Sequence, residues 1–406
     1  MDFEPWWFIL VPVLFGLGWV AARVDFKQML SESKQLPDSY FKGLNFLLNE
    51  EPDRAIDAFI EVAKLDSETT ELHFALGSLF RRRGEMERAI RVHQSLLART
   101  DLSAADKENA QFEIAQDFLK AGMLDRAEAA FEAVSQGRHA VAAVRALIHI
   151  YESGHDWPQA IAAVSRLREL VDEPVPQLVH YQCEQAEAAL TQKVPALEQA
   201  EIALAAAERA AKQLGEKEGS RASTARIFML RAQLAQLHQD YALEQFYLLE
   251  VLRVAPMYAG LVAADLKHCF ERQGLEAQGR QILAKHYEQY PYVDIFAPLF
   301  QAIHQQQGAT KAWVFARKAL KQNPSLLGLD RSLALELQHV QLDDTQAEQI
   351  VGKDLALVRG LLHKHIQRLD KYACQQCGFE AKQFYWQCPG CTHWESYAPR
   401  RLEEIQ

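Results

Sequence analysis

The chain has 406 residues, enough for about two or three domains of ordinary size. Apolar residues make up 49% and charged residues 24%, which is typical of a globular protein and excludes a largely disordered one. The net charge of -10 disfavours a dedicated nucleic-acid binder, and six cysteines are too few for a disulfide-stabilised scaffold.

An uncharged apolar segment lies at the beginning of the chain. From Pro5 to Ala22 no residue is charged, and a helix of this length spans roughly 27 Å, enough to cross a thin hydrocarbon core. Arg23 and Lys27 follow it, so the positive-inside rule places the bulk of the chain in the cytoplasm. We therefore predict a single-pass transmembrane helix at 1–23. A cleaved signal peptide is the alternative, disfavoured because no basic residue precedes the apolar run.

A 34-residue repeat follows. Gly43 and Gly77 are 34 residues apart, and so are Ala55 and Ala89. This is the period of the tetratricopeptide (TPR) repeat, in which small residues allow two antiparallel helices to approach closely. The pattern predicts an all-α fold, a superhelical TPR solenoid with a concave surface suited to protein segments. A helical repeat of another family is the alternative.

The repeat pattern continues through the middle of the chain, with spacings that vary around 34 residues. Three prolines, Pro256, Pro291 and Pro324, recur at nearly the repeat period, and each is expected to end the second helix of a pair. We read 215–224, GEKEGSRAST, as a loop. The predicted array covers 36–340 in about eight to nine units, and a connecting helix is expected at 341–371.

Four cysteines are clustered near the C-terminus. Cys374 and Cys377 form one CxxC pair, Cys388 and Cys391 form a second, and ten residues separate the pairs. Two such pairs supply four thiolates to one tetrahedral ion, either Zn or a single Fe. A site filled by four thiolates has no open position for water or substrate. We predict a closed metal-binding module at 372–400, too small to fold without its ion.

Other candidate residues are interpreted structurally. Aromatic residues surround the cysteine pairs, and we expect them to form a small core for the module: Tyr372, Phe379, Tyr385, Trp386 and Trp394. Cys183 and Cys269 are isolated and expected to be buried as small apolar side chains. The sequence contains no recognised nucleotide-binding or hydrolase motif, so we predict no catalytic and no cofactor-binding residues besides the metal ligands.

The order of these features resembles the lipopolysaccharide assembly protein B family of Gram-negative inner membranes. The resemblance covers the whole chain and rests on the span ending at Arg23, the repeat YFKGLNFLLNEEPDRAIDAF and the CxxCGF…YWxCPGC run from Cys374 to Cys391. The resemblance implies a rubredoxin-like module that holds rubredoxin-type iron. Its four ligands would be Cys374, Cys377, Cys388 and Cys391. The ten-residue gap differs from free-standing rubredoxins, as does Thr392, where they usually have Gly.

The resemblance also implies a function. Family members are non-catalytic adaptors beside a membrane AAA+ protease and regulate lipopolysaccharide synthesis, by promoting turnover of the deacetylase that commits precursor to lipid A. Other lipopolysaccharide assembly proteins are further expected partners, nucleic acid is not, and the inner membrane is the expected location. Two alternatives remain open at this stage: a rubredoxin-like electron-transfer protein, and a general scaffold for assembling membrane complexes.

Overall fold

The computed structural model describes residues 70–405 apart from 172–173, 219–220 and 341–345, together with isolated positions between 42 and 58. The predicted anchor at 1–23 and most of the first repeat lie outside the described residues. The chain divides into two compact units, residues 1–147 and 148–406, and each is described by itself.

The described part of the first unit consists of helices joined by short connections. The helices are α4 (Thr70–Arg82), α5 (Met86–Leu97), α6 (Ala104–Lys120), α7 (Leu124–Ala133) and the start of α8 (Ala140–Ser153). Helix α4 packs on α5 and α6 on α7, while α4 also contacts α6. Two hairpins stacked through their first helices are the TPR arrangement.

The second unit continues this pattern. Its helices are α9 (Trp157–Leu170), α10 (Gln177–Leu190), α11 (Leu197–Glu218), α12 (Arg221–Leu237), α13 (Tyr241–Val254), α14 (Ala259–Arg272), α15 (Glu276–Gln289), α16 (Val293–Gln307), α17 (Ala309–Gln322), α18 (Leu326–Val340) and α19 (Gln346–Ile366). Consecutive helices from α10 onward pack as hairpins, and first helices contact the next first helices, as in α10 with α12 and α14 with α16. The predicted all-α TPR solenoid is confirmed.

The repeat glycine is explained by a close approach between helices. A Cβ atom on Gly77 in α4 would lie 2.2 Å from Nε2 of His93 in α5, so only glycine fits there. His93 is completely buried, and its Nδ1 lies 2.6 Å from Oδ2 of Asp117 in α6. Asp117 in turn accepts a hydrogen bond of 2.8 Å from Arg81. The 34-residue period therefore marks a point where side chains of three helices meet.

The prolines end helices as predicted, whereas the predicted loop is wrong. Pro256, Pro291 and Pro324 each lie two residues beyond the last residue of α13, α15 and α17. By contrast, α11 runs to Glu218 and α12 begins at Arg221, so most of 215–224 is helical. The polar, glycine-containing run suggested a loop, but extension of the α11–α12 hairpin overrides that local preference.

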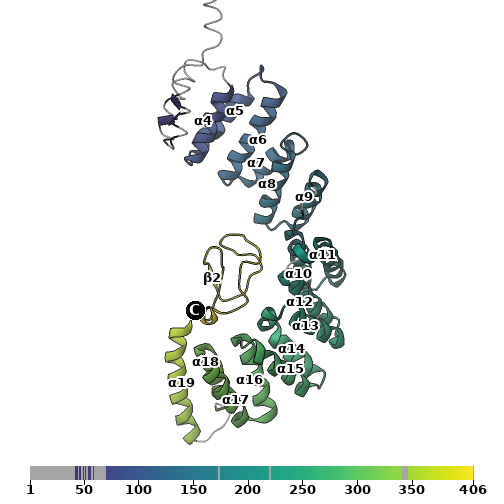
Figure 1. Ribbon diagram of the computed structural model, residues 1–406, viewed down its shortest axis with the longest axis vertical. Helices are drawn as coiled ribbons and strands as arrows, with labels where there is room; N and C mark the ends of the chain where they lie inside the picture. Colours follow the sequence, from purple (N-terminus) through teal and green to yellow (C-terminus); the bar gives the residue numbers. More distant parts are fainter. Residues whose placement is uncertain are drawn as a thin grey trace, which may run out of the picture. The chain divides into compact units, whose positions relative to one another are not determined.

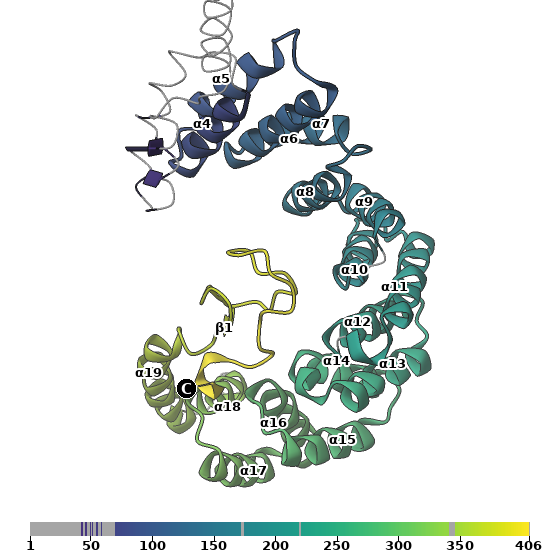
Figure 2. The same ribbon diagram turned by 45° about the horizontal axis from the view of Figure 1, so that its top comes forward.

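A small module with two short strands follows α19. Strand β1 (Tyr372–Ala373) pairs antiparallel with β2 (Glu380–Ala381), and a short 3₁₀ helix, η2 (Leu402–Glu404), ends the described chain. In the second unit, the helices from α9 to α19 follow an arc, and the module lies on the inner side of that arc (Figures 1 and 2). The inner surface of the repeats is therefore partly occupied by the chain itself.

The described helices differ from a membrane span in length or in composition. None of them is by itself long and apolar enough to cross a bilayer, and one pair, Tyr241–Val254 with Pro256–Arg272, meets the length and composition requirement only jointly across a bend of 119°.

Candidate metal centre

Two tight turns bring the four cysteines together. Cys374 directly follows β1, and the amide of Gly378 donates to its carbonyl at 2.9 Å. The amide of Thr392 makes the corresponding bond to the carbonyl of Cys388 at 2.8 Å. Gly378 has φ 75° and Thr392 has φ 58°, so both turns need a left-handed residue. Thr392 adopts this conformation at a cost of about 1–2 kcal/mol relative to glycine.

The four sulfur atoms fit one tetrahedral ion. All four lie within 4.8 Å of one another, with 3.7 Å between Cys374 and Cys391 and 3.7 Å between Cys377 and Cys388. Sulfurs placed about 2.3 Å from a central ion form a tetrahedron with edges of about 3.8 Å. All four predicted site residues are thus brought together, and the described residues contain no other such group of three or more histidine, cysteine or acidic side chains.

Backbone amides support the thiolate form of this centre. The amide of Gln376 donates to Sγ of Cys374 at 3.4 Å, and the amide of Gly390 donates to Sγ of Cys388 at 3.3 Å. Burial opposes ionisation of Cys374, but hydrogen bonds from the Ser396 hydroxyl and nearby amides lower the pKa of its thiol to about 6. Cys374 and Cys388 are buried, whereas Cys377 is exposed, so the site has a protein-facing side and an open side.

The prediction for the surrounding aromatic residues is confirmed in part. Tyr372 forms a small core with Tyr397 and the two buried cysteines, and Phe384 packs on it. Phe379 is 42% exposed and Tyr385 is 36% exposed, so neither is a core residue. The prediction is wrong for Trp394, which packs against the repeats. Trp386 does both: it packs edge-to-face on Phe384 of the module, with ring centroids 5.0 Å apart, and also contacts the repeats.

Trp394 contacts helices from the beginning of the second unit. Its indole stacks on the imidazole of His180 in α10, with ring centroids 4.7 Å apart, and packs against the edge of Trp157 in α9. The indole N–H donates a hydrogen bond to the carboxylate of Glu152 in α8. Trp386 stacks on Tyr258 in η1 (Pro256–Tyr258), with centroids 5.5 Å apart and planes 13° apart. The module is therefore attached to several consecutive repeats.

A buried arginine lies beneath both tryptophans. The guanidinium carbon of Arg226 in α12 is 5.5 Å from the ring of Trp386 and 5.9 Å from that of Trp394. Arg226 is 1% exposed, and its Nη2 lies 2.6 Å from Glu184 and 2.9 Å from Glu187. The two carboxylates come from α10, so displacement of the module would leave these ion pairs in place but remove both aromatic faces from the buried cation.

His180 links this arginine to the module. Its Nε2 lies 2.8 Å from Oε1 of Glu395, and its Nδ1 lies 3.4 Å from Nη1 of Arg226. Burial lowers the pKa of His180, with the Arg226 charge acting in the same direction and Glu395 against it. The neutral imidazole can donate from Nε2 to Glu395 while its Nδ1 accepts from Arg226.

The chain end attaches the module to the last repeats. Arg401 contacts Asp294 at the start of α16 at 2.9 Å, and the Tyr372 hydroxyl donates to the same carboxylate at 2.8 Å. Glu404 accepts from the amide of Val293, and Glu403 accepts from the amide of Leu326. These two glutamates cap the N-termini of α16 and α18, where backbone amides otherwise lack partners.

Sequence reasoning missed all of these contact residues outside the module. Arg226, His180 and Glu152 lie on three different helices, and nothing in their local sequence distinguishes them from ordinary surface residues. The only feature of the sequence that could have indicated such an interface is the number of aromatic residues around the cysteines, which is larger than so small a core can hold. Cys183 and Cys269 are buried within the repeats, as predicted.

Comparisons with known proteins agree with both parts of the chain. Residues 372–399 match a family model described as a rubredoxin metal binding domain, and residues 72–108 match the tetratricopeptide repeat. The chain is 28% identical over 402 residues to lipopolysaccharide assembly protein B of Escherichia coli strain K12, covering 97% of each. The protein of that name from Haemophilus influenzae is 27% identical over 409 residues, covering 98% of each.

Solved structures of repeat proteins are also similar. One is the C-terminal part of a TPR repeat-containing protein from Cytophaga hutchinsonii, at 14% identity and a TM-score of 0.39, covering 61% of this chain and 95% of that chain.

Proposed function

Because the chain is related over nearly its whole length to the lipopolysaccharide assembly protein B proteins, we propose that it is a membrane-anchored, non-catalytic adaptor that regulates lipopolysaccharide synthesis. The observation that carries the proposal is this similarity over nearly the whole chain, which spans both the repeat match at 72–108 and the metal-domain match at 372–399. The proposed partners are a membrane AAA+ protease and, as the client, the deacetylase of the lipid A pathway, with other lipopolysaccharide assembly proteins as further partners.

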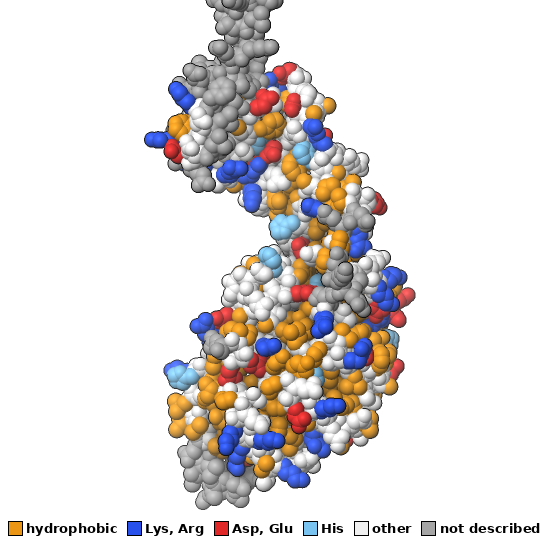
Figure 3. All heavy atoms as spheres, viewed as in Figure 1, with side chains coloured by type: hydrophobic (Ala, Val, Ile, Leu, Met, Phe, Trp, Pro, Cys, Tyr) orange, Lys and Arg blue, Asp and Glu red, His pale blue; other side chains and the backbone are white. Residues whose placement is uncertain are grey.

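The surface of the repeats supports protein partners. On the face of the second unit drawn in Figure 3, apolar side chains are interspersed with acidic and basic ones. Mixed surfaces of this kind are usual for protein–protein recognition. Repeat solenoids present such surfaces over long distances and position several partners without any chemistry of their own.

The proposed anchor explains how the adaptor would meet its partners. A single transmembrane helix at 1–23 would hold the repeats at the cytoplasmic side of the inner membrane. Confinement beside a membrane-bound protease raises the effective concentration of each partner for the other.

The metal in this proposal is structural. Cys374, Cys377, Cys388 and Cys391 would hold one ion, proposed as rubredoxin-type iron with zinc as the alternative, because four thiolates suit both. When bound, the ion supplies the folding energy of a module too small for a core of its own. The residues of the chain then do the rest: Trp386 and Trp394 hold the module against Arg226 and His180.

The experiment is a time course of the deacetylase level in cells. Four forms are compared: the intact protein, a form lacking residues 1–22, the Cys374→Ser/Cys377→Ser double variant, and Gln375→Ser as a control. Gln375 is exposed beside the site and supplies no metal ligand. We expect the deacetylase to be stabilised in the truncated form and in the double cysteine variant only. Unchanged turnover in both would contradict the proposal.

A further inference from the structure

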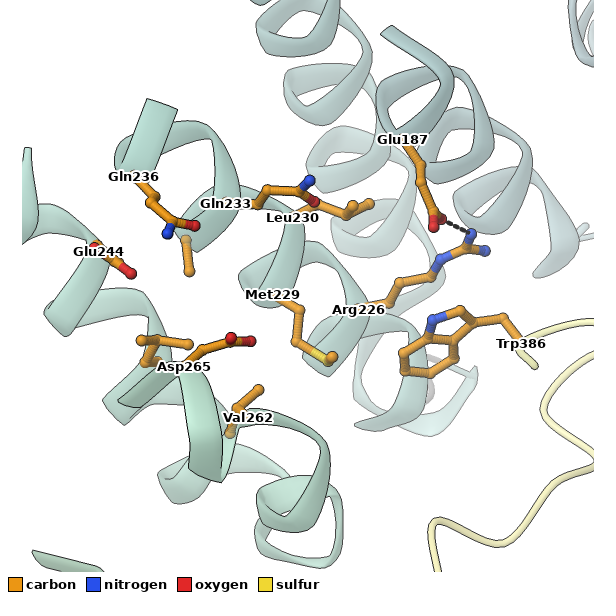
Figure 4. Close-up of a pocket in the computed structure, with 12 residues that line it drawn as sticks. Glu187, Arg226, Met229, Leu230, Gln233, Gln236, Glu244, Val262, Asp265 and Trp386 are labelled. Atoms are coloured by element: carbon orange, nitrogen blue, oxygen red, sulfur yellow. Dashed lines mark hydrogen bonds and ion pairs between the residues drawn. The ribbon is translucent and has the colours of Figure 1, made fainter. Parts of the chain in front are cut away.

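A cavity lies between the repeats and the module. It has a volume of about 310 Å³ and is lined by α10, α12, α13 and α14, with Trp386 of the module at one end. Met229, Leu230, Leu248 and Val262 provide an apolar wall. Figure 4 shows the side chains of Met229 and Gln233 on α12 facing Val262 and Asp265 on α14 across this space.

Several polar groups of the cavity have no partner within the described part of the chain. The carboxylate of Asp265 points into the space between α12 and α14 and makes no hydrogen bond or ion pair there. The amides of Gln233 and Gln236 line the same cavity. Glu244 is 2% exposed, and while its Oε1 pairs with Arg272, its Oε2 has no hydrogen-bond partner.

The neighbouring cations are already paired with acidic side chains other than Asp265. Arg226 is paired with Glu184 and Glu187, Arg272 with Glu244, and Lys267 and His268 with Glu271. Asp265 is exposed, but the helices beside it reduce the hydration of its carboxyl, and this desolvation raises its pKa despite the opposing charges of His268 and Arg272. Among the described residues, Asp265 is thus an exposed acid with no cation paired to it, whereas the buried Glu244 on the same cavity is paired with Arg272.

We propose that this cavity binds a cationic side chain, Lys or Arg, of a protein segment lying along the inner surface of the repeats. Asp265 accepts hydrogen bonds from the charged head, with the Gln233 and Gln236 amide oxygens as further acceptors. The aliphatic stem lies along Met229 and Val262, as long basic side chains do on apolar surfaces. The Oε2 atom of Glu244, which has no hydrogen-bond partner among the described residues, adds a favourable potential without direct contact.

A protein segment is the occupant we favour because the cavity forms part of an extended surface. It lies on helices α12 and α14, which contact neighbouring first helices of the array, and beside the module. The cavity is large enough for one long side chain with water but too small for a folded element. The inference deepens the proposed adaptor function, because it names what part of a client the second unit would hold.

Methionine methyl NMR provides a direct test. The chain has six methionines, so the spectrum is sparse, and Met229→Leu identifies the Met229 resonance. Full-length protein is titrated with Nα-acetyl-lysine N-methylamide and its arginine counterpart. The norleucine analogue, with the same stem and no charge, and the glutamate analogue serve as controls. We expect a saturable shift of Met229 with the two cationic probes only, while Met257, outside the cavity, stays unchanged.

Two variants assign the effect to the carboxylate. Asp265→Asn should weaken binding of the lysine probe about tenfold or more, because a charged hydrogen-bond partner is lost. Glu201→Gln, an exposed acid on α11, should leave binding unchanged and controls for net charge. Preserved resonances of the other methionines show that Asp265→Asn is folded.

Three results would overturn the inference: no shift of Met229 up to about 50 mM lysine probe, equal shifts with the norleucine analogue, or full binding by Asp265→Asn. Deacetylase turnover is not part of this measurement. A negative NMR titration therefore rules out the cavity assignment and leaves the adaptor function untouched. Conversely, normal lysine binding together with unchanged deacetylase turnover in the truncated and double cysteine variants rules out the adaptor function and leaves the cavity assignment untouched.

Discussion

The indole of Trp394 lies almost parallel to the imidazole of His180, with an interplanar angle of 14° and a centroid separation of 4.7 Å. Trp394 belongs to the metal module and His180 to helix α10 of the second unit. Arg226 lies against the same indole and against Trp386. The module and the repeats thus share one interface of aromatic and charged side chains, and the folding of the module and the state of the repeats should be coupled.

Trp394→Ala should loosen the module from the repeats without emptying the metal site. The variant loses a stacked ring and the hydrogen bond to Glu152, which we expect to cost about 2–4 kcal/mol of attachment. Hydrogen exchange should rise over α10 and 372–400, while metal content stays unchanged. Tyr385→Ala removes an exposed aromatic of the same module and should have little effect. Equal protection in both variants would argue against the interface.

Acid should weaken the attachment through His180. Its pKa lies below the ordinary value of 6.5 in the folded protein because of burial, so unfolded chains bind the proton more readily. The stability contributed by neutral His180 is present above pH 6.5 and is lost as pH falls through the lower folded pKa. The urea midpoint of the second unit should therefore drop between about pH 7.5 and pH 5.5. His180→Phe keeps the stacked ring and should make the urea midpoint less dependent on pH. The same pH dependence in both proteins would refute the role of His180.

Removal of the metal should unfold the module and expose the inner surface of the second unit. Without an ion, four thiols within 4.8 Å have no bonding partner and the small core around Tyr372 and Tyr397 is not sufficient. Hydrogen exchange should become fast over 372–400, while the helical circular dichroism of the repeats is largely retained. Reloading with Zn should restore protection as fully as reloading with Fe. A strict requirement for Fe would instead support the electron-transfer alternative.

Gly77→Ala should destabilise the first unit. The new Cβ would lie 2.2 Å from Nε2 of His93, forcing that buried ring away from Asp117. We expect a loss of about 1–3 kcal/mol, as for other overpacked core positions. Gly360→Ala on α19 is the matched control, because nothing lies within 4 Å of its added Cβ. That control should be neutral or stabilising by up to about 1 kcal/mol in denaturant unfolding.

Asp294→Ala should detach the end of the chain from the last repeats. Its carboxylate is shared by Arg331, Arg401 and the Tyr372 hydroxyl, and its removal leaves the two partly buried cations with only the more exposed carboxylate of Asp370. The expected cost is about 3–5 kcal/mol. Asp370→Ala removes a more exposed partner of the same arginines and should cost less than about 1 kcal/mol. Urea unfolding measures both, and similar costs would show that Asp294 has no special role.

Local patterns in the chain predicted the repeats and the metal ligands. Small residues such as Gly77 and Ala89 occupy equivalent repeat positions because two helices must approach closely there. The four cysteines form two CxxC pairs because one turn presents two sulfurs to one ion. Both constraints act over a few residues or over one repeat, so spacing alone reveals them. The helical 215–218 segment shows the limit, since packing overrode a polar, loop-like sequence.

Only the tertiary structure determines where the module lies against the repeats. Arg226, His180 and Glu152 meet Trp386 and Trp394 because stacked repeats curve back toward the C-terminal module within one unit. Such contacts join residues that lie far apart in the chain and leave no periodic trace. The sequence by itself therefore determined which units form and which thiolates can bind an ion. The partners of those units, and the cavity beside Asp265, depend on how the helices stack, because long-range packing sets them and local spacing does not.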